Sequence, residues 1–255
     1  MNISKKSKAW IGGSILPLII LLIWQYTVSS GYIAALILPS PETVIKTFIT
    51  QLTEKDLLFH ILASFKRVLI GFLIGTAAGF SFGLLIGLSR SAEKIFSPFF
   101  NVVRQISIIG WIPLIVMWFG MTELSRIIII SVAAFYPIAL NTFAGVRNVP
   151  KEYIELSAVY GYKGLNRIKR IVLPAALPSI TTGVTLALGM SWAILMAAEI
   201  FIQTKFGIGT RIETGRGSFN MALVLVGIFI VGSLGFTMTT VVEKFANSTN
   251  KGSKN

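Results

Sequence analysis

Residues 68–88 read VLIGFLIGTAAGFSFGLLIGL and contain no charged side chain. A helix needs about 20 mostly apolar residues to cross the hydrocarbon core of a bilayer, so this stretch predicts a membrane span. Glycine recurs at every fourth position, which places five small residues on one helix face: Gly71, Gly75, Gly79, Gly83 and Gly87. Small residues let helices approach closely in lipid, and we expect this face to pack inside one bundle rather than at a subunit interface.

The composition of the whole chain is typical of a membrane protein. Of its 255 residues, 54% are hydrophobic and 13% are charged, and the mean hydropathy is +0.77. These values exclude a soluble single-domain enzyme. The long intervals without charged residues predict six spans, near residues 10–28, 68–88, 105–122, 127–146, 172–198 and 221–242.

The predicted spans carry further packing signals. A second stripe of small residues lies in the fifth span, at Ser179, Gly183, Ala187 and Ser191, and we expect it to pack within the bundle as well. Prolines in or at the ends of spans permit kinks; they are Pro113, Pro137, Pro174 and Pro178.

The first predicted span follows Lys5, Lys6 and Lys8, so it has the basic-then-apolar order of a signal peptide. Its apolar stretch is longer than a signal core and residues 29–31 form no clear cleavage site, so we expect an uncleaved span. With the N-terminus in the cytoplasm, 15 of the 23 lysines and arginines fall on the cytoplasmic side and 8 on the other. The positive-inside rule therefore predicts that both termini are cytoplasmic.

The segment between the first two spans begins at Pro39-Ser40-Pro41, which stops one helix and starts another. Residues 42–65 place apolar side chains on one side and predict an amphipathic segment along the outer membrane surface. His60, the single histidine, lies in this segment. We interpret it as an interfacial side chain, with a pH-sensing role as the alternative.

Several kinds of chemistry are excluded by what the sequence lacks. It has no cysteine and one histidine, so we expect no metal site and no catalytic residues. The predicted spans contain no ionisable residue, whereas secondary transporters usually keep such groups at membrane depth. No Gly-x-x-x-x-Gly-Lys-Ser/Thr phosphate-binding loop occurs. Active transport would therefore need a partner that supplies the energy.

The longest hydrophilic interval predicted to face the cytoplasm is residues 147–170. Pro150 suits the first turn of a helix, and Gly161 suits a left-handed cap at its end. A second short helix is expected from about Leu165. Residues 155–174 read ELSAVYGYKGLNRIKRIVLP.

This loop resembles the EAA loop of permease subunits from bacterial ATP-binding-cassette (ABC) importers. In that family Glu-Ala-Ala is followed after three residues by Gly, and after nine more by Ile-x-Leu-Pro. The matching elements are Glu155, Gly161, Ile171, Leu173 and Pro174, and the departures are Leu156 and Ser157 in place of the two alanines. Five elements at the family's spacing make this resemblance specific.

The resemblance extends over about residues 38–245. Its further motifs are LPSPETV at 38–44, SFKRVLIGFLIG at 64–75, WIPLIVMWFG at 111–120, FYPIALNTFAGV at 135–146 and AEIFIQTKFGIGT at 198–210. They are similar to the nitrate, sulfonate and taurine branch of these permeases. Relatives that carry riboflavin or thiamine-pyrimidine precursors share the motifs, so both groups of substrate stay open.

The resemblance implies an all-α membrane protein with six transmembrane helices, the type I ABC importer permease fold and no enzymatic activity. It implies a second permease subunit, expected to be identical, two cytoplasmic ABC ATPases and an extracytoplasmic substrate-binding protein, assembled in the bacterial cytoplasmic membrane. ATP and Mg²⁺ would bind the ATPase partner, and we expect no cofactor and no nucleic acid on this chain. We expect residues 1–59 to form the first helix and outer segment, 60–244 the permease core and 245–255 a polar tail.

In that family the loop forms a coupling helix that docks on the ATPase. The residues to which this role carries over are Tyr153, Glu155, Leu156, Ser157, Ala158, Tyr160, Gly161, Tyr162, Lys163, Ile171, Leu173 and Pro174. The candidates for the translocation path are Asn141, Met190, Ser191, Trp192 and Glu199. For Glu199, gating, contact with the binding protein and plain anchoring are alternatives. A secondary carrier and a membrane scaffold without a transport cycle are the rival functions.

Overall fold

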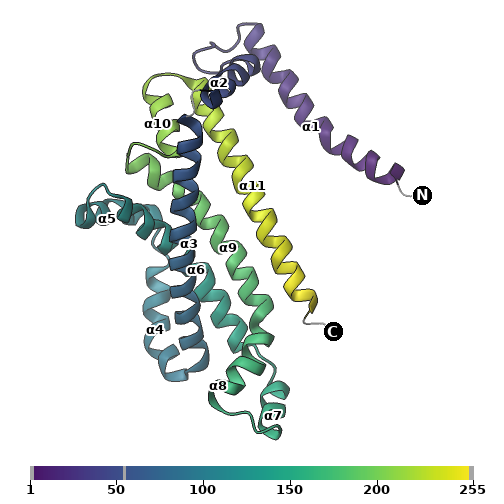
Figure 1. Cartoon of the computed structure of the whole chain (residues 1–255), viewed down its shortest axis with the longest axis vertical. Helices are drawn as coiled ribbons and strands as arrows, with labels where there is room; N and C mark the ends of the chain where they lie inside the picture. Colours follow the sequence, from purple (N-terminus) through teal and green to yellow (C-terminus); the bar gives the residue numbers. More distant parts are fainter. Residues whose placement is uncertain (1–2, 54–55, 253–255) are drawn as a thin grey trace.

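The computed structural model describes residues 3–53 and 56–252, and within them all regular secondary structure is helical (Figure 1). The first elements are α1 (Ile3–Ser29), α2 (Pro41–Thr53), α3 (Asp56–Leu88), α4 (Arg90–Val103), the 3-10 turn η1 (Ile108–Trp111) and α5 (Ile112–Phe119). The remaining elements are α6 (Glu123–Arg147), α7 (Lys151–Val159), α8 (Gly164–Arg167), the π turn η2 (Ile168–Val172), α9 (Leu173–Phe201), α10 (Ile208–Gly217) and α11 (Met221–Gly252). The expected all-α class is confirmed.

Among the described residues, four helices are long and apolar enough to cross a membrane, and the bent pair of α4 with η1 and α5 is a fifth candidate. The four are α3, α6, the continuous run from α8 through η2 to α9, and α11. Helix α1 lies at the first predicted span, which confirms a helix there. Its described apolar part, Ile15–Ser29, is shorter than the four helices that can cross a membrane. The side chains of the lysines before it lie outside the described residues. The count of six spans, the cytoplasmic termini and the division at residues 59 and 244 stay predictions.

The third predicted span, residues 105–122, is wrong as a single straight helix. The chain there forms η1 and the short helix α5, which together bend by 88° from the preceding α4. Pro113, which we expected to kink a helix, lies in the first turn of α5, where its missing N–H costs no hydrogen bond. Gly120 ends α5 with a φ of +72°, a conformation that glycine adopts readily. The interval is apolar enough to cross a bilayer. Its helical part begins only at Ile108 and already ends at Phe119, so it is shorter than the predicted span.

The glycine face of α3 packs against α6 over its full length. At each of the five ladder glycines, a Cβ atom would lie less than 3.0 Å from an atom of α6. The contacts advance from Ile130 beside Gly71 to Val146 beside Gly87, so the two helices run in the same direction. The packing inside one bundle predicted from this face is confirmed.

The small-residue stripe of α9 packs on the other side of α6. A Cβ atom on Gly183 would lie 2.7 Å from the Cβ atom of Asn141. One turn away, the Ser179 hydroxyl donates to the Asn141 carbonyl at 2.8 Å. Helix α6 is therefore held between α3 and α9, and these three helices form the centre of the bundle.

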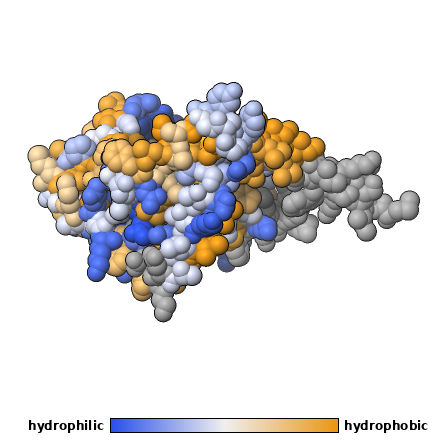
Figure 2. All heavy atoms as spheres, turned by 90° about the horizontal axis from the view of Figure 1, so that it is seen from above, coloured by the Kyte–Doolittle hydropathy of each residue, from blue (hydrophilic) through white to orange (hydrophobic). Residues whose placement is uncertain are grey.

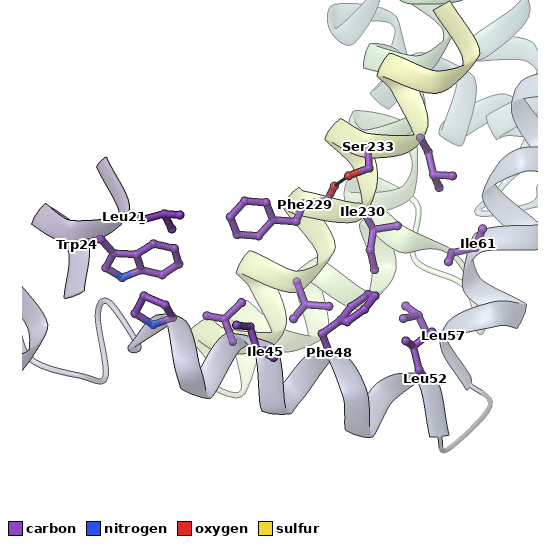
Figure 3. Close-up of a pocket in the computed structure, with 14 residues that line it drawn as sticks. Leu21, Trp24, Ile45, Phe48, Leu52, Leu57, Ile61, Phe229, Ile230 and Ser233 are labelled. Carbon is purple, nitrogen blue, oxygen red and sulfur yellow. Dashed lines mark hydrogen bonds between the residues drawn. The ribbon is translucent and has the colours of Figure 1, made fainter. Parts of the chain in front are cut away.

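The opposite side of the bundle opens into an apolar groove. Helix α1 leaves the bundle at an angle (Figure 1), and a groove of about 450 Å³ lies between it, α2 and α11. Trp24 faces Phe229 across this groove, with ring centroids 6.5 Å apart (Figure 3). On the end of the bundle that carries α2 and α10, hydrophilic residues gather over part of the surface and hydrophobic residues flank them (Figure 2).

Candidate functional site

The loop of residues 147–170 lies at the end of the bundle opposite to α2 and α10 (Figure 1). As predicted, it contains a helix after Pro150 and a second short helix, which begins at Gly164. The second helix continues through the π turn η2 into α9. The loop is therefore joined to a membrane-spanning helix without a break in the helical backbone.

The end of α7 is fixed by the glycine that the sequence singled out. Gly161 has a φ of +71°. The Tyr162 N–H donates to the Ser157 carbonyl at 2.8 Å and the Gly161 N–H donates to the Ala158 carbonyl at 3.0 Å, which is the Schellman arrangement. Among the described residues, no heavy atom beyond its chain neighbours lies within 4 Å of a Cβ built on Gly161. Its backbone conformation, rather than lack of space, therefore requires glycine here.

Helix α7 presents an apolar face to the surroundings. Tyr153, Leu156 and Tyr160 follow one another at spacings of three and four residues, so they share one face of the helix. All three are exposed, and Tyr160 has 69% of its surface accessible. Other predicted coupling residues are also exposed: Glu155, Ala158, Gly161 and Lys163. Large apolar side chains left uncovered on an ordered helix are typical of an interaction surface.

The other face of α7 anchors it to the bundle. Ser157 is fully buried and its hydroxyl donates to the Ile154 carbonyl at 2.6 Å. Ile154 and Leu173 pack on the buried cluster that includes Val146 and Val172. This cluster joins the loop to the ends of α6 and α9.

Two tyrosines and one arginine are in contact in the loop next to α8. The rings of Tyr160 and Tyr162 are stacked, with centroids 6.3 Å apart. The Arg170 guanidinium lies 5.2 Å from the centroid of the Tyr162 ring and donates to its hydroxyl at 3.2 Å. At the base of the loop, Ile171 is partly buried within η2 and Pro174 is exposed in the first turn of α9. The structure thus gathers the predicted coupling residues at one end of the bundle.

A second polar cluster lies at the opposite end, around Glu199. This residue is completely buried. Its carboxylate accepts from Arg67 Nη1 at 2.7 Å, from the Ser64 hydroxyl at 2.7 Å and from the Gly209 N–H at 2.8 Å. Gly207 lies over this pair, and a Cβ atom there would be 2.7 Å from Glu199 Cδ. The carboxylate is therefore fully hydrogen-bonded in its buried position.

The cluster extends to the start of α6 through Glu123. The carboxylate of Glu123 accepts two parallel bonds from Arg67, at 2.6 and 2.7 Å, and one from Arg126 Nη1 at 2.8 Å. Arg126 is fully buried and also donates twice to the Ile202 carbonyl, at 2.7 and 2.9 Å. Two arginines and two glutamates thus fasten the ends of α3, α6 and α9 to one another and to the following loop.

The expectation that His60 is an interfacial side chain is wrong. His60 is buried, and its Nδ1 lies 2.7 Å from the Gly207 carbonyl and 2.9 Å from the Gly207 N–H. Its ring also packs edge-on against Phe206. The amphipathic segment ends earlier than predicted, because α3 begins at Asp56 and carries His60 into the contact with this loop.

The other residues proposed for the translocation path differ in exposure. Asn141 and Ser191 each donate to a carbonyl one turn earlier in their own helix, and Ser191 is fully buried. Trp192 is 8% exposed and its indole N–H donates to the Val231 carbonyl of α11 at 3.0 Å. Met190 is the most exposed of them, at 42%.

The buried arginines were missed by reasoning from the sequence. Arg67 and Arg126 were counted only as charges that orient the spans. Arg67 precedes the second predicted span, Glu123 and Arg126 precede the fourth, and Glu199 follows the fifth. With alternating span directions, all four charged residues fall at the same end of the bundle. This shared position was the signal that could have paired the arginines with the glutamates.

Residues 71–251 match the family described as binding-protein-dependent transport system inner membrane component. The chain is 34% identical over 243 residues to SsuC of Bacillus subtilis, a permease protein assigned to aliphatic sulfonate transport, covering 94% of this chain and 88% of the relative. It is 32% identical over 253 residues to the bicarbonate transport system permease protein CmpB of Synechococcus elongatus, covering 93% and 90%. The taurine transport system permease protein TauC of Escherichia coli is 29% identical, covering 86% and 82%.

Solved structures show a similar fold. An inward-facing conformation of the MetNI methionine ABC transporter has a chain that matches with a TM-score of 0.65 and 17% identity, covering 76% of this chain and 95% of that one. A second crystal form of the same transporter matches with a TM-score of 0.57 and 19% identity, covering 74% and 97%. At these identities the likeness concerns the fold alone, and it confirms the expected importer permease fold.

Proposed function

This chain belongs to the family of binding-protein-dependent transport system inner membrane components, and we propose that it is the permease of an importer for a small solute of the sulfonate, taurine or nitrate type. The family is one of transport subunits in the inner membrane. The names of the relatives support the substrate group, and the riboflavin or thiamine-pyrimidine group is the second candidate.

The proposed assembly has two permeases, expected to be identical, two cytoplasmic ABC ATPases and an extracytoplasmic binding protein. ATP and Mg²⁺ would bind the ATPases. The observation that carries the proposal is the exposed apolar face of α7, formed by Tyr153, Leu156 and Tyr160 on a short helix whose end is fixed by Gly161. A rigid helix with aromatic groups can seat in a pocket of a partner, as such groups do at the centres of interfaces.

The structure supports a direct mechanical connection from this face to the bundle. Displacement of α7 would act on α6 and α9 through Ile154 and Leu173, which pack on their ends. It would act on α9 a second time through the continuous helix of α8 and η2. Closure of the ATPases could thus bias the bundle between inward-open and outward-open states, which the solute alone shifts only by its differential affinity.

The second polar cluster, around Glu199, has a positioning role in this proposal. Glu199 and its arginine partners hold the ends of three helices in one arrangement, and Glu199 has no surface with which to contact a binding protein directly. Among the residues proposed for the path, Met190 is the most exposed and therefore the one best placed to contact solute.

The experiment that tests the function is gentle purification of the tagged protein from its own membranes, with mass spectrometry of the proteins that accompany it. We expect a stoichiometric P-loop ATPase and a binding protein. The matched variants are Tyr160→Ala on α7 and Tyr32→Ala between α1 and α2, where the tyrosine is 79% exposed. The first should lose the ATPase and the second should keep it.

Other results would favour the rival functions. Absence of an ATPase, under conditions that keep a control transporter intact, would favour a scaffold. Uptake that survives depletion of ATP while the ion gradient is preserved would indicate a secondary carrier. Equal retention of the ATPase by both tyrosine variants would remove α7 as the docking element.

A further inference from the structure

Helix α4 has two flanks of opposite character. Polar side chains recur at spacings of four and three residues, which puts them on one flank: Arg90, Lys94, Ser97, Asn101 and Arg104, which follows the last helical residue. The other flank presents exposed apolar side chains: Ile95, Phe99 and Val102. Between the flanks, Ala92 and Phe100 are buried against the bundle. One side of this helix is therefore suited to lipid and the other is not.

The position of α4 places the later part of its polar flank, Asn101 and Arg104, at membrane depth. Phe100 packs in an aromatic cluster with Phe82 of α3, at 5.3 Å between ring centroids, and with Phe135 and Tyr136 of α6, at 6.1 and 5.7 Å. These three partners lie within the spans Leu57–Leu88 and Glu123–Arg147. A single residue, Ser89, separates α3 from α4, and the 14 residues of α4 rise about 21 Å. Arg104 therefore lies farther from the turn between α3 and α4 than Phe100 does, and its side chain is exposed.

Charged side chains at this depth require water or an ion as a neighbour, since an arginine exposed to hydrocarbon costs several kcal/mol. The polar flank opens on a cavity of about 630 Å³, lined by Arg90, Lys94, Ser97 and Asn101 together with Arg147 of α6. The chain bends by 88° after α4, and α5 extends sideways from the bundle (Figure 1). The flank thus borders an open cavity that follows α4 from the ends of the α3 and α6 spans, at Arg90 and Arg147, to Asn101.

The groups around this cavity are mainly hydrogen-bond donors. Glu93 is the one carboxylate in its lining, and it is paired with Arg147 at 2.6 Å. Within the described part of the chain, Arg90 and Lys94 have no carboxylate at salt-bridge distance. The Ser97 hydroxyl is shielded from solvent and makes no hydrogen bond to any described group. The Asn101 side-chain oxygen accepts from Arg104 Nε at 3.0 Å, which leaves its NH₂ group as a donor.

We propose that the polar flank of α4 lines the cytoplasmic half of the solute path and that this path selects an anion. The inference rests on the proposed transport function and narrows it. Lysine, arginine, hydroxyl and amide donors together match the oxygens of a sulfonate, nitrate or carboxylate. The fixed positive charge would raise the local concentration of anions and repel cations.

Single cysteines can test this directly because the chain has none of its own. Asn101→Cys reports on the polar flank because Asn101 is exposed and lines the cavity, and Ile95→Cys and Phe99→Cys are controls on the apolar flank of the same helix. Each is assembled with its ATPase in inside-out membrane vesicles. The probes are two membrane-impermeant thiol reagents of similar size, the anionic sulfonatoethyl and the cationic trimethylammonioethyl methanethiosulfonate. Reaction rates are read by gel shift of the unmodified thiols.

We expect the Asn101→Cys thiol to react and both controls to resist. The anionic reagent should react about tenfold faster than the cationic one at low ionic strength, relative to the same ratio for a free thiol. Adding Lys94→Gln and Arg104→Gln should collapse this preference while labelling persists. Equal protection of both flanks would overturn the water-lined path, and equal rates for the two reagents would overturn its selectivity for anions.

A further outcome would overturn the proposal. Labelling of Asn101→Cys only in vesicles of pure phosphatidylcholine would assign the cavity to an anionic lipid headgroup. The labelling needs no ATP and no identified solute. Failure of the labelling experiment therefore leaves the copurification result intact. Conversely, if no ATPase copurifies but the labelling pattern is observed, another channel-like function would have to explain that pattern.

Discussion

Arg67 of α3 and Glu199 of α9 lie 132 positions apart in the chain and meet at 2.7 Å, both almost entirely removed from solvent. The pair is not isolated, because Arg67 also holds Glu123 and Glu199 also accepts from the Ser64 hydroxyl. Removing both charges from water is costly, and only this full set of hydrogen bonds offsets the cost. The pair therefore specifies which helix ends adjoin.

Glu199→Ala should destabilise the folded protein strongly, because it leaves the Arg67 guanidinium buried with one carboxylate fewer. The expected loss is about 3–5 kcal/mol, which is the usual effect of removing one partner of a buried pair. Thermal unfolding of the detergent-solubilised protein, followed by tryptophan fluorescence, measures it. Glu199→Gln should lose less because it keeps the shape and a hydrogen-bond acceptor.

The control for that prediction is Glu42→Gln in α2. Lys46 hydrogen-bonds to Glu42 and holds the pKa of this carboxyl below its ordinary value, yet both side chains are exposed. Exposed pairs contribute little to stability, so the melting temperature should not change measurably. A comparable loss in both variants would show that Glu199 has no special role.

Gly79→Ala should destabilise the contact between α3 and α6. Its Cβ atom would lie 2.5 Å from the Phe135 carbonyl oxygen, and backbone cannot move aside as a side chain can. Overpacking of this kind costs about 1–3 kcal/mol. Gly232→Ala in α11 is the matched control, since nothing beyond its own helix lies within 4 Å of its Cβ position. Yield and melting temperature should fall for the first variant and hold for the second.

Gly161→Val should uncouple the loop without preventing insertion. A left-handed backbone costs an L-residue about 1–2 kcal/mol, which reduces the capped population of α7 about 5- to 30-fold. Solute uptake and ATPase copurification should fall while the amount in the membrane stays normal. Gly161→Asn, which tolerates a positive φ better, should restore most of the activity. Normal uptake by the valine variant would contradict the coupling role.

Trp192→Phe separates packing from solute contact. The indole donates to the Val231 carbonyl and lies against Gly235. Loss of this bond and of one ring should reduce stability by about 1–3 kcal/mol. We expect uptake per folded molecule to hold. If uptake per folded molecule falls at unchanged stability, Trp192 lines the path.

The long apolar spans and the glycine face of α3 could be predicted because they follow from periodicity and from the small size of glycine. The Gly161 cap could be predicted for a similar reason, since one residue type suits its backbone. The bend after α4 could not, because the interval of residues 105–122 satisfies the length and hydrophobicity of a span. Only its contacts and the positions of Pro113 and Gly120 decide that it breaks.

The buried charges were hidden for a different reason. Arg67 and Glu199 stand just outside the predicted spans, where a charge normally meets water and orients the helix. Their partners are remote in sequence, so no local pattern marks them as buried. The polar flank of α4 has a local pattern, but its meaning depends on the depth at which Phe100 packs.

The backbone contact between α3 and α6 has a consequence for motion. Two helices that touch at every fourth residue along a ladder, and are clamped at one end by Arg67 and Glu123, have no freedom to slide. They must turn together as a rigid body, with α9 carried along by its own close contacts. Any change of shape during a transport cycle is then concentrated at hinges, and the widened turn at Ile168–Val172, between the loop and this block, is one place where the helix can flex.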